Sequence, residues 1–192
     1  AFDHKTISEA SLKQEWVSTD ILRTMLDLSP TATRSALPGG KFVIQHLVGV
    51  VARCEADPEI MCAAVPDLLR SDPNPCEYAS YAIAEFVVES CSDEEYVIFE
   101  DVFRTILDAT TIDGETTARR VWVEEADDSV LVGILYSNMI TLILEYHPWI
   151  ARVMLRNEPI LFSTLRLSQD YRLAVPTLLA AGADVLARGA HR

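Results

Sequence analysis

The stretch that decides the fold is residues 57–107, DPEIMCAAVPDLLRSDPNPCEYASYAIAEFVVESCSDEEYVIFEDVFRTIL, because it holds three helix starts in succession. In DPE (57–59) a capping aspartate precedes a proline suited to the first helical position and an acid in the first turn. NPCE (74–77) repeats that arrangement, and SDEE (92–95) has the form of a capping box. The sequence therefore predicts three helices that begin near residues 57, 74 and 92.

Each of these starts is followed by apolar residues at helical spacing, which predicts one buried face per helix. In the first helix this face is Met61, Ala64, Val65, Leu68 and Leu69. In the second it is Ala79, Ala82, Ile83, Phe86 and Val87, and in the third it is Tyr96, Phe99, Val102, Phe103, Ile106 and Leu107.

The rest of the chain follows the same pattern, so we expect an all-α fold of eight to ten helices with strand content below about 5%. Short loops make successive helices antiparallel neighbours, which predicts helix hairpins stacked as a short α-solenoid or packed as an irregular multi-helix bundle. Residues 116–125 are ambiguous, with a short helix favoured over a strand. The other expected helices span residues 6–28, 43–54, 129–146 (long and buried), 149–156, 158–167 and 171–186, with loops at 35–40 and 110–115.

The steps between the three central starts are 17 and 18 residues, so a helix hairpin would repeat about every 35 residues. This spacing resembles armadillo and HEAT-type helical repeats over about residues 40–110, although no residue signature accompanies it. The segment LLAAGADV (178–185) resembles the close of an ankyrin repeat, but the start typical of that repeat is missing upstream.

Length and composition suit one all-helical domain over residues 1–192. Hydrophobic residues make up 49% of the 192 positions, which excludes a disordered chain. Because the chain starts at Ala1 without methionine, we expect it to be part of a larger protein. No signal peptide opens it, and its uncharged stretch at residues 129–144 is shorter than the roughly 20 residues of a membrane span. We therefore expect a cytoplasmic or nuclear protein without a membrane span.

The net charge of −13 comes from the middle of the chain, where residues 61–128 carry 17 acids and 4 bases. Such a surface repels phosphate backbones, so direct binding of nucleic acid is disfavoured.

No motif for a cofactor or metal is present, and the sequence predicts neither. The four cysteines lack a C-x-x-C pair and a histidine at zinc-ligand spacing. We expect buried, reduced thiols, while two disulfides in a secreted protein remain the alternative. The residues concerned are Cys54, Cys62, Cys76 and Cys91, and His4, His46, His147 and His191.

In the absence of catalytic motifs, the sequence favours an interaction scaffold or adaptor that binds a peptide or helix of another protein, and not an enzyme. Two helix faces are acidic, and each is either a solvated face or a docking face for a basic segment of a partner. An all-helical enzyme with a dispersed site and a self-assembling structural segment are the alternatives. The oligomeric state is left open. The acidic faces consist of Glu77, Glu85 and Glu89, and of Glu94, Asp101 and Asp108.

Overall fold

The computed structural model describes residues 28, 33–34, 40–52, 58–89, 100–126, 128–166 and 174–186. Within these ranges 76% of the structure is helical, in nine α-helices with a single two-stranded sheet, which confirms the all-α prediction. The α-helices are α3 (Val43–Ala52), α4 (Pro58–Ser71), α5 (Pro75–Glu89), α6 (Glu100–Thr110), α7 (Thr116–Arg119), α8 (Asp128–Tyr136), α9 (Ile140–Tyr146), α10 (Ile160–Arg166) and α11 (Ala174–Ala180).

Two of the three central helix starts lie where the sequence predicts them. Helix α4 begins at Pro58 and α5 at Pro75. The side-chain oxygen of Asn74 accepts a hydrogen bond from the backbone N–H of Glu77 at 3.3 Å, as expected of a cap. The third start, residues 92–95, lies outside the described residues, as does the predicted helix over residues 6–27.

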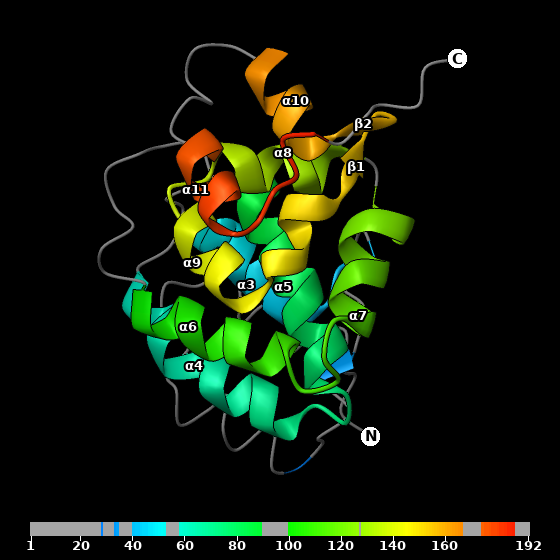
Figure 1. The fold of residues 1–192 in the computed structure, drawn as a ribbon. Coiled ribbons are helices and arrows are strands. Elements are labelled where there is room, and N and C mark those ends of the chain that lie inside the picture. Colours follow the sequence, from blue (N-terminus) through cyan, green and yellow to red (C-terminus); the bar gives the residue numbers. More distant parts are fainter. Residues whose placement is uncertain are drawn as a thin grey trace.

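Helix α5 occupies the centre of the molecule, in contact with α3, α6 and α8 (Figure 1). Contacts between helices that are not successive form two rows, α3–α5–α8 and α4–α6–α9. Helix α6 touches α5 across the rows, and α7 packs on another side of α5. This arrangement buries α5 on most sides and leaves one face of α6 exposed.

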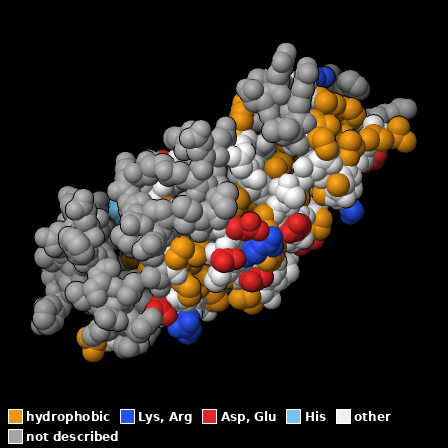
Figure 2. Space-filling view, turned by 90° about the vertical axis from the view of Figure 1, so that its left-hand side faces the viewer, with side chains coloured by type: hydrophobic (Ala, Val, Ile, Leu, Met, Phe, Trp, Pro, Cys, Tyr) orange, Lys and Arg blue, Asp and Glu red, His pale blue; other side chains and the backbone are white. Residues whose placement is uncertain are grey.

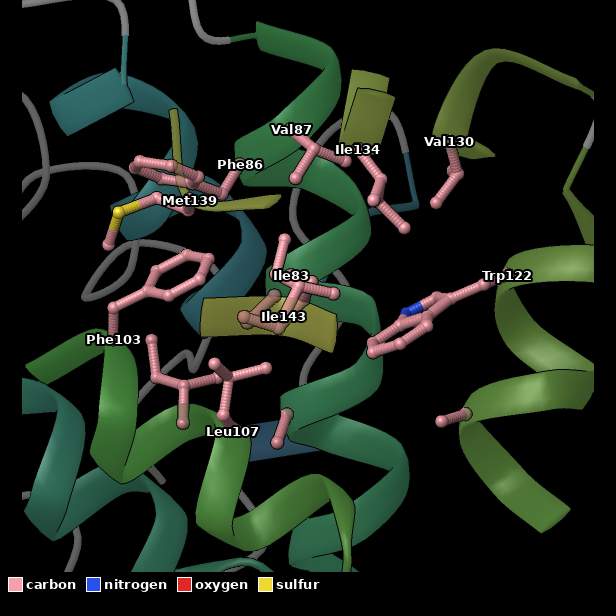
Figure 3. Packing of buried hydrophobic residues seen from close by; sticks show 14 of the residues in the cluster. Ile83, Phe86, Val87, Phe103, Leu107, Trp122, Val130, Ile134, Met139 and Ile143 are labelled. Carbon is pink, nitrogen blue, oxygen red and sulfur yellow. The ribbon is translucent and has the colours of Figure 1, made fainter. Parts of the chain in front are cut away.

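The core is formed where α5 meets its neighbours (Figure 3). The rings of Phe86 from α5 and Phe103 from α6 face each other with centroids 4.9 Å apart. Trp122 reaches toward α5 from the π-helix η3 (Arg120–Glu125), and its indole N–H donates to the carbonyl oxygen of Ser80 at 2.8 Å. The short helix that the sequence favoured over residues 116–125 is therefore confirmed, as α7 followed by η3.

The predicted long helix over residues 129–146 is wrong, because the chain bends there by 117° between α8 and α9. At the bend the Ser137 hydroxyl oxygen accepts a hydrogen bond from the backbone N–H of Met139 at 3.1 Å. Serine and asparagine compete in this way with helical backbone bonds, and Asn138 follows directly. Each of the two helices contributes buried apolar residues to the core. In the described residues no single helix is long and apolar enough to cross a membrane. Only α8 and α9 taken together have the length and composition of a membrane span, and the bend separates them.

Gly133 lets α8 approach the backbone of α5. A Cβ atom at this position would lie 2.5 Å from the carbonyl oxygen of Val87. A side chain there would force the two helices apart, so the glycine is a packing requirement.

The segment after α9 also differs from the prediction. A 3₁₀-helix η4 (Pro148–Arg152) is followed by the hairpin of β1 (Met154–Leu155) and β2 (Glu158–Pro159) where a helix was expected. The two hairpin residues, Arg156 and Asn157, both have positive φ angles, as a tight two-residue turn requires. The last two helices differ from the prediction where the structure describes them, because α10 begins at Ile160 instead of residue 158 and α11 ends at Ala180 instead of residue 186.

Candidate functional site

The predicted acidic residues of α5 are engaged by the chain's own bases. Glu77 accepts hydrogen bonds from Arg34 at 2.6 Å and from Arg120 at 2.7 Å, and these bonds, Arg34 first, hold its pKa below the ordinary value against the effect of burial. Lys41 Nζ lies 2.5 Å from a carboxylate oxygen of Glu85 and 3.7 Å from one of Glu89. These three carboxylates therefore hold α5 to its neighbours.

The predicted acidic residues of α6 are arranged differently. Asp101 and Asp108 are exposed, and neither side chain has a hydrogen-bond or ion-pair partner in the described part of the chain. Residues seven apart lie on the same side of a helix, so both face the same way. Glu94, the third predicted residue of this face, lies outside the described residues.

A single base stands among the acids of this face. Arg104 binds Glu100 of its own helix at 2.7 Å and lies 3.5 Å from Glu145 of α9. Figure 2 views the side on which α9 and the start of α6 lie in Figure 1, and acidic side chains gather there around a basic one. Four acids against one base leave the surface negative. We call Glu100, Asp101, Asp108 and Glu145 the acidic face.

A buried ion pair ties residues 33–34 to the start of α5. The Asp72 side chain is fully buried and forms a bidentate ion pair with Arg34. Its Oδ1 accepts from Arg34 Nη2 at 2.7 Å, and its Oδ2 accepts from Arg34 Nε at 2.9 Å. It also accepts from the Thr33 hydroxyl at 3.0 Å and from the backbone N–H of Asn74 at 2.8 Å. Because its oxygens are so fully satisfied, this carboxylate has a structural role.

His147 is a second buried polar group, and its neighbours fix its protons. The indole N–H of Trp149 can only donate, and it lies 3.2 Å from Nδ1 of His147. Nε2 therefore carries the proton and donates to the Thr110 hydroxyl at 2.6 Å, which in turn donates to the carbonyl oxygen of Leu107. Burial lowers the pKa of His147 to about 4. The imidazole is thus neutral with both nitrogens occupied.

Cys76, near the first turn of α5, lies in a small polar cluster with Asp113. Its sulfur is 3.0 Å from a carboxylate oxygen of Asp113 and 3.3 Å from the carbonyl oxygen of Thr110. Burial, followed by the bond to Asp113, raises the pKa of this thiol to about 11. Burial alone would raise the pKa of Asp113, but hydrogen bonds from Cys76 and Thr117 outweigh it and the pKa is lowered.

These proton positions do not favour nucleophilic chemistry. A reactive cysteine needs a lowered pKa and a base ready to take its proton. Here the Cys76 thiol is protonated beside a carboxylate, and the His147 nitrogens are both used. Neither Cys62 nor Cys76 forms a disulfide in the described part of the chain, and Cys54 and Cys91 lie outside it. No three His, Cys, Asp or Glu side chains in the described ranges gather as metal ligands.

The structure also forms a cleft that the sequence did not predict. It has a volume of about 230 Å³ between the start of α7 and the 3₁₀-helix η4. Its lining residues come from two segments that are 29 positions apart at their nearest, and they are Glu115, Arg119, Pro148, Trp149 and Arg152. Trp149 belongs both to the core and to the cleft, since it is 6% exposed and lines the cleft. No local motif could have identified the site, because it depends on how α7 meets η4.

No known protein family matches this sequence, and no curated protein or solved structure is significantly similar to it. The acidic face, the buried polar groups and the cleft are therefore the features of the molecule that bear on its function.

Proposed function

We propose that this chain is a helical scaffold that binds another protein, in the manner of armadillo and HEAT-type repeats. The two rows of helices, α3–α5–α8 and α4–α6–α9, support this proposal, because stacked helix hairpins bury a continuous core and leave a long outer surface. The resemblance lies in the order of contacts and in the helix spacing.

The observation that carries the proposal is the contrast between the acids of α5 and those of α6. Glu77 and Glu85 are paired with bases of the same molecule, whereas Asp101 and Asp108 are exposed without partners in the described residues. An unpaired carboxylate at a surface keeps its charge available for an incoming cation, and an acidic face of this kind steers a basic partner toward it.

The proposed partner is a protein with a segment rich in lysine or arginine that lies across the acidic face. Its encounter with α6 is fast at low salt, since screening at physiological ionic strength acts beyond about 8 Å. We place this interaction in the cytoplasm or the nucleus, where thiols such as Cys62 and Cys76 stay reduced.

The test uses the Asp101→Asn/Asp108→Asn double variant and a synthetic arginine-rich peptide as probe. Association rates are measured at low and at physiological salt. We expect the variant to associate several-fold more slowly at low salt and to show a weaker salt dependence, although Glu100 and Glu145 keep their charges. Glu124→Gln is the matched control, because Glu124 of η3 is also exposed and has no partner in the described residues.

Equal rates for the double variant and the wild type, with folding intact, would overturn the proposal and leave the acidic face a solvated surface. Measurement of the molecular mass at several protein concentrations separates the scaffold from the self-assembling segment. A mass that rises with concentration and is unaffected by the double variant would favour self-assembly.

A further inference from the structure

The basic side chains of this protein divide into two groups. Lys41 and every described arginine except two lie within 3.2 Å of a carboxylate oxygen. The two exceptions are Arg119 and Arg152, which have no carboxylate partner in the described residues. Both line the cleft between α7 and η4. The cleft is therefore a local basic site in a chain with a net charge of −13.

Arg119 is held in position by the aromatic floor of the cleft. Its guanidinium lies 5.6 Å from the centroid of the Trp149 ring, on which it can stack. Trp149 is itself fixed by its hydrogen bond to His147 and by the ring of Trp122, whose centroid is 6.2 Å away at an interplanar angle of 21°. The floor is therefore rigid before any ligand arrives.

Arg152 comes from the other wall of the cleft, at the end of η4. One of its terminal nitrogens lies near Gly182. A Cβ atom built on that glycine would be 3.4 Å from this nitrogen. Arg119 and Arg152 approach the same space from two elements, so two guanidinium groups can donate to one ligand. Guanidinium groups bind carboxylate and phosphate with paired, parallel hydrogen bonds.

The charge of the lining decides between these two anions. Two arginines and Glu115 give the cleft a charge of +1. A carboxylate, with a single negative charge, neutralises it, whereas a doubly charged phosphate would leave an excess negative charge beside Glu115. The volume of about 230 Å³ exceeds that of a carboxylate group, and Pro148 and Trp149 offer apolar contact to the body that carries it.

We propose that the cleft binds a carboxylate group through Arg119 and Arg152, with its carrier lying against Pro148 and Trp149. The carboxylate belongs either to a free small organic acid or to an acidic side chain of a protein. This site is separate from the acidic face on α6 and does not depend on the function proposed for that face.

The experiment titrates the intact chain with benzoate, with inorganic phosphate, and with a short peptide whose termini are blocked and which carries one glutamate. The same peptide with glutamine in place of glutamate has no carboxylate and serves as the blank. Binding is followed by calorimetry and by the NMR signal of the Trp149 indole N–H. We expect saturable binding of a carboxylate and weaker binding of phosphate. Tighter binding of the peptide than of benzoate assigns the site to a protein ligand, and the reverse assigns it to a free acid.

Two variants and two controls make the result specific. Arg119→Gln and Arg152→Gln should each weaken carboxylate binding at least about tenfold, the usual effect of losing a charged hydrogen-bond donor. Arg156→Gln should leave it unchanged, since Arg156 is paired with Asp128. Glu115→Gln should tighten carboxylate binding, because it removes a negative charge that repels the ligand. Thermal unfolding checks that each variant is folded. We expect both arginine variants to fold, because Arg119 and Arg152 are exposed.

Three results would overturn the proposal: no saturable binding of any carboxylate, tighter binding of phosphate than of benzoate, or equal affinities for the wild type and both arginine variants.

Discussion

Arg34 and Arg119 have similar aromatic neighbours and opposite electrostatic surroundings. The Arg34 guanidinium lies 5.4 Å from the centroid of the Phe42 ring, and that of Arg119 lies 5.6 Å from the centroid of the Trp149 ring. Arg34 also binds Asp72 and Glu77, whereas Arg119 has no carboxylate partner in the described residues. One region, at the start of α5, uses its charges to hold the fold together, and the other, at the cleft, leaves them available.

This difference follows from burial. A buried charge is costly unless it is paired, and the buried Asp72 is paired with Arg34. A charge at the surface loses little by staying unpaired, since an exposed ion pair contributes only about 0–1 kcal/mol. Buried paired charges therefore stabilise the fold, whereas exposed unpaired charges stay available to a ligand, and the comparison can be tested at each kind of site.

The largest effect is expected at Asp72. Replacing Asp72 with Ala should lower the free energy of unfolding by about 3 kcal/mol, the lower end for breaking a buried pair, because Arg34 keeps its bond to Glu77. Chemical denaturation of the variant and the wild type measures it. A loss below about 1 kcal/mol would show that the network at the start of α5 contributes little to stability.

A smaller effect concerns His147, beneath the floor of the cleft. Its pKa is about 4 in the folded protein and about 6.5 when unfolded, so the unfolded chain takes up a proton first as the pH falls. The stability that neutral His147 contributes is complete at pH 8 and should be about 2 kcal/mol smaller at pH 5. The loss continues until the pH reaches the folded pKa.

The check is the pH dependence of unfolding for the wild type and the His147→Gln variant between pH 8 and pH 5. Glutamine can both donate to Thr110 and accept from Trp149 but does not titrate in this range. We expect the free energy of unfolding to change less with pH in the variant than in the wild type. Identical slopes would mean that His147 is as easily protonated in the folded protein as in the unfolded chain.

The smallest effect on stability is expected at the acidic face. Asp101→Ala and Asp108→Ala should each change the free energy of unfolding by no more than about 0.5 kcal/mol, as is usual for exposed residues without partners. Thermal unfolding of both variants measures this. A loss near that of Asp72→Ala would show that these carboxylates have a structural partner and would remove the basis of the comparison.

Helix identity was largely predictable from the sequence, whereas the bends and the site were not. Caps such as Asn74 and apolar spacing are local signals, so α4 and α5 begin where predicted. The break at Ser137 was missed because its uncharged neighbours continue the apolar pattern, while its cause is a local hydrogen bond to the backbone. The hairpin at Arg156 and Asn157 was missed for a similar reason, since no glycine marks its turn.

The candidate sites depend on contacts between distant residues. The sequence predicted Glu77, Glu85 and Asp101 together as acidic residues, because it contains no information on which of them meets a base. Glu77 meets Arg34 from 43 positions away, and Arg119 meets Trp149 from 30 positions away. These contacts exist only once the helices are packed, so the sequence alone could not predict them.

The division into paired and available arginines is tested most directly by NMR of the arginine Nε–H groups, with and without benzoate. In the free protein we predict slow hydrogen exchange at Arg34, whose Nε–H donates to Asp72 at 2.9 Å, and fast exchange at Arg119 and Arg152. Benzoate should shift and protect only the latter two signals. Equally fast exchange at all three arginines, or protection of Arg119 and Arg152 without ligand, would contradict the account.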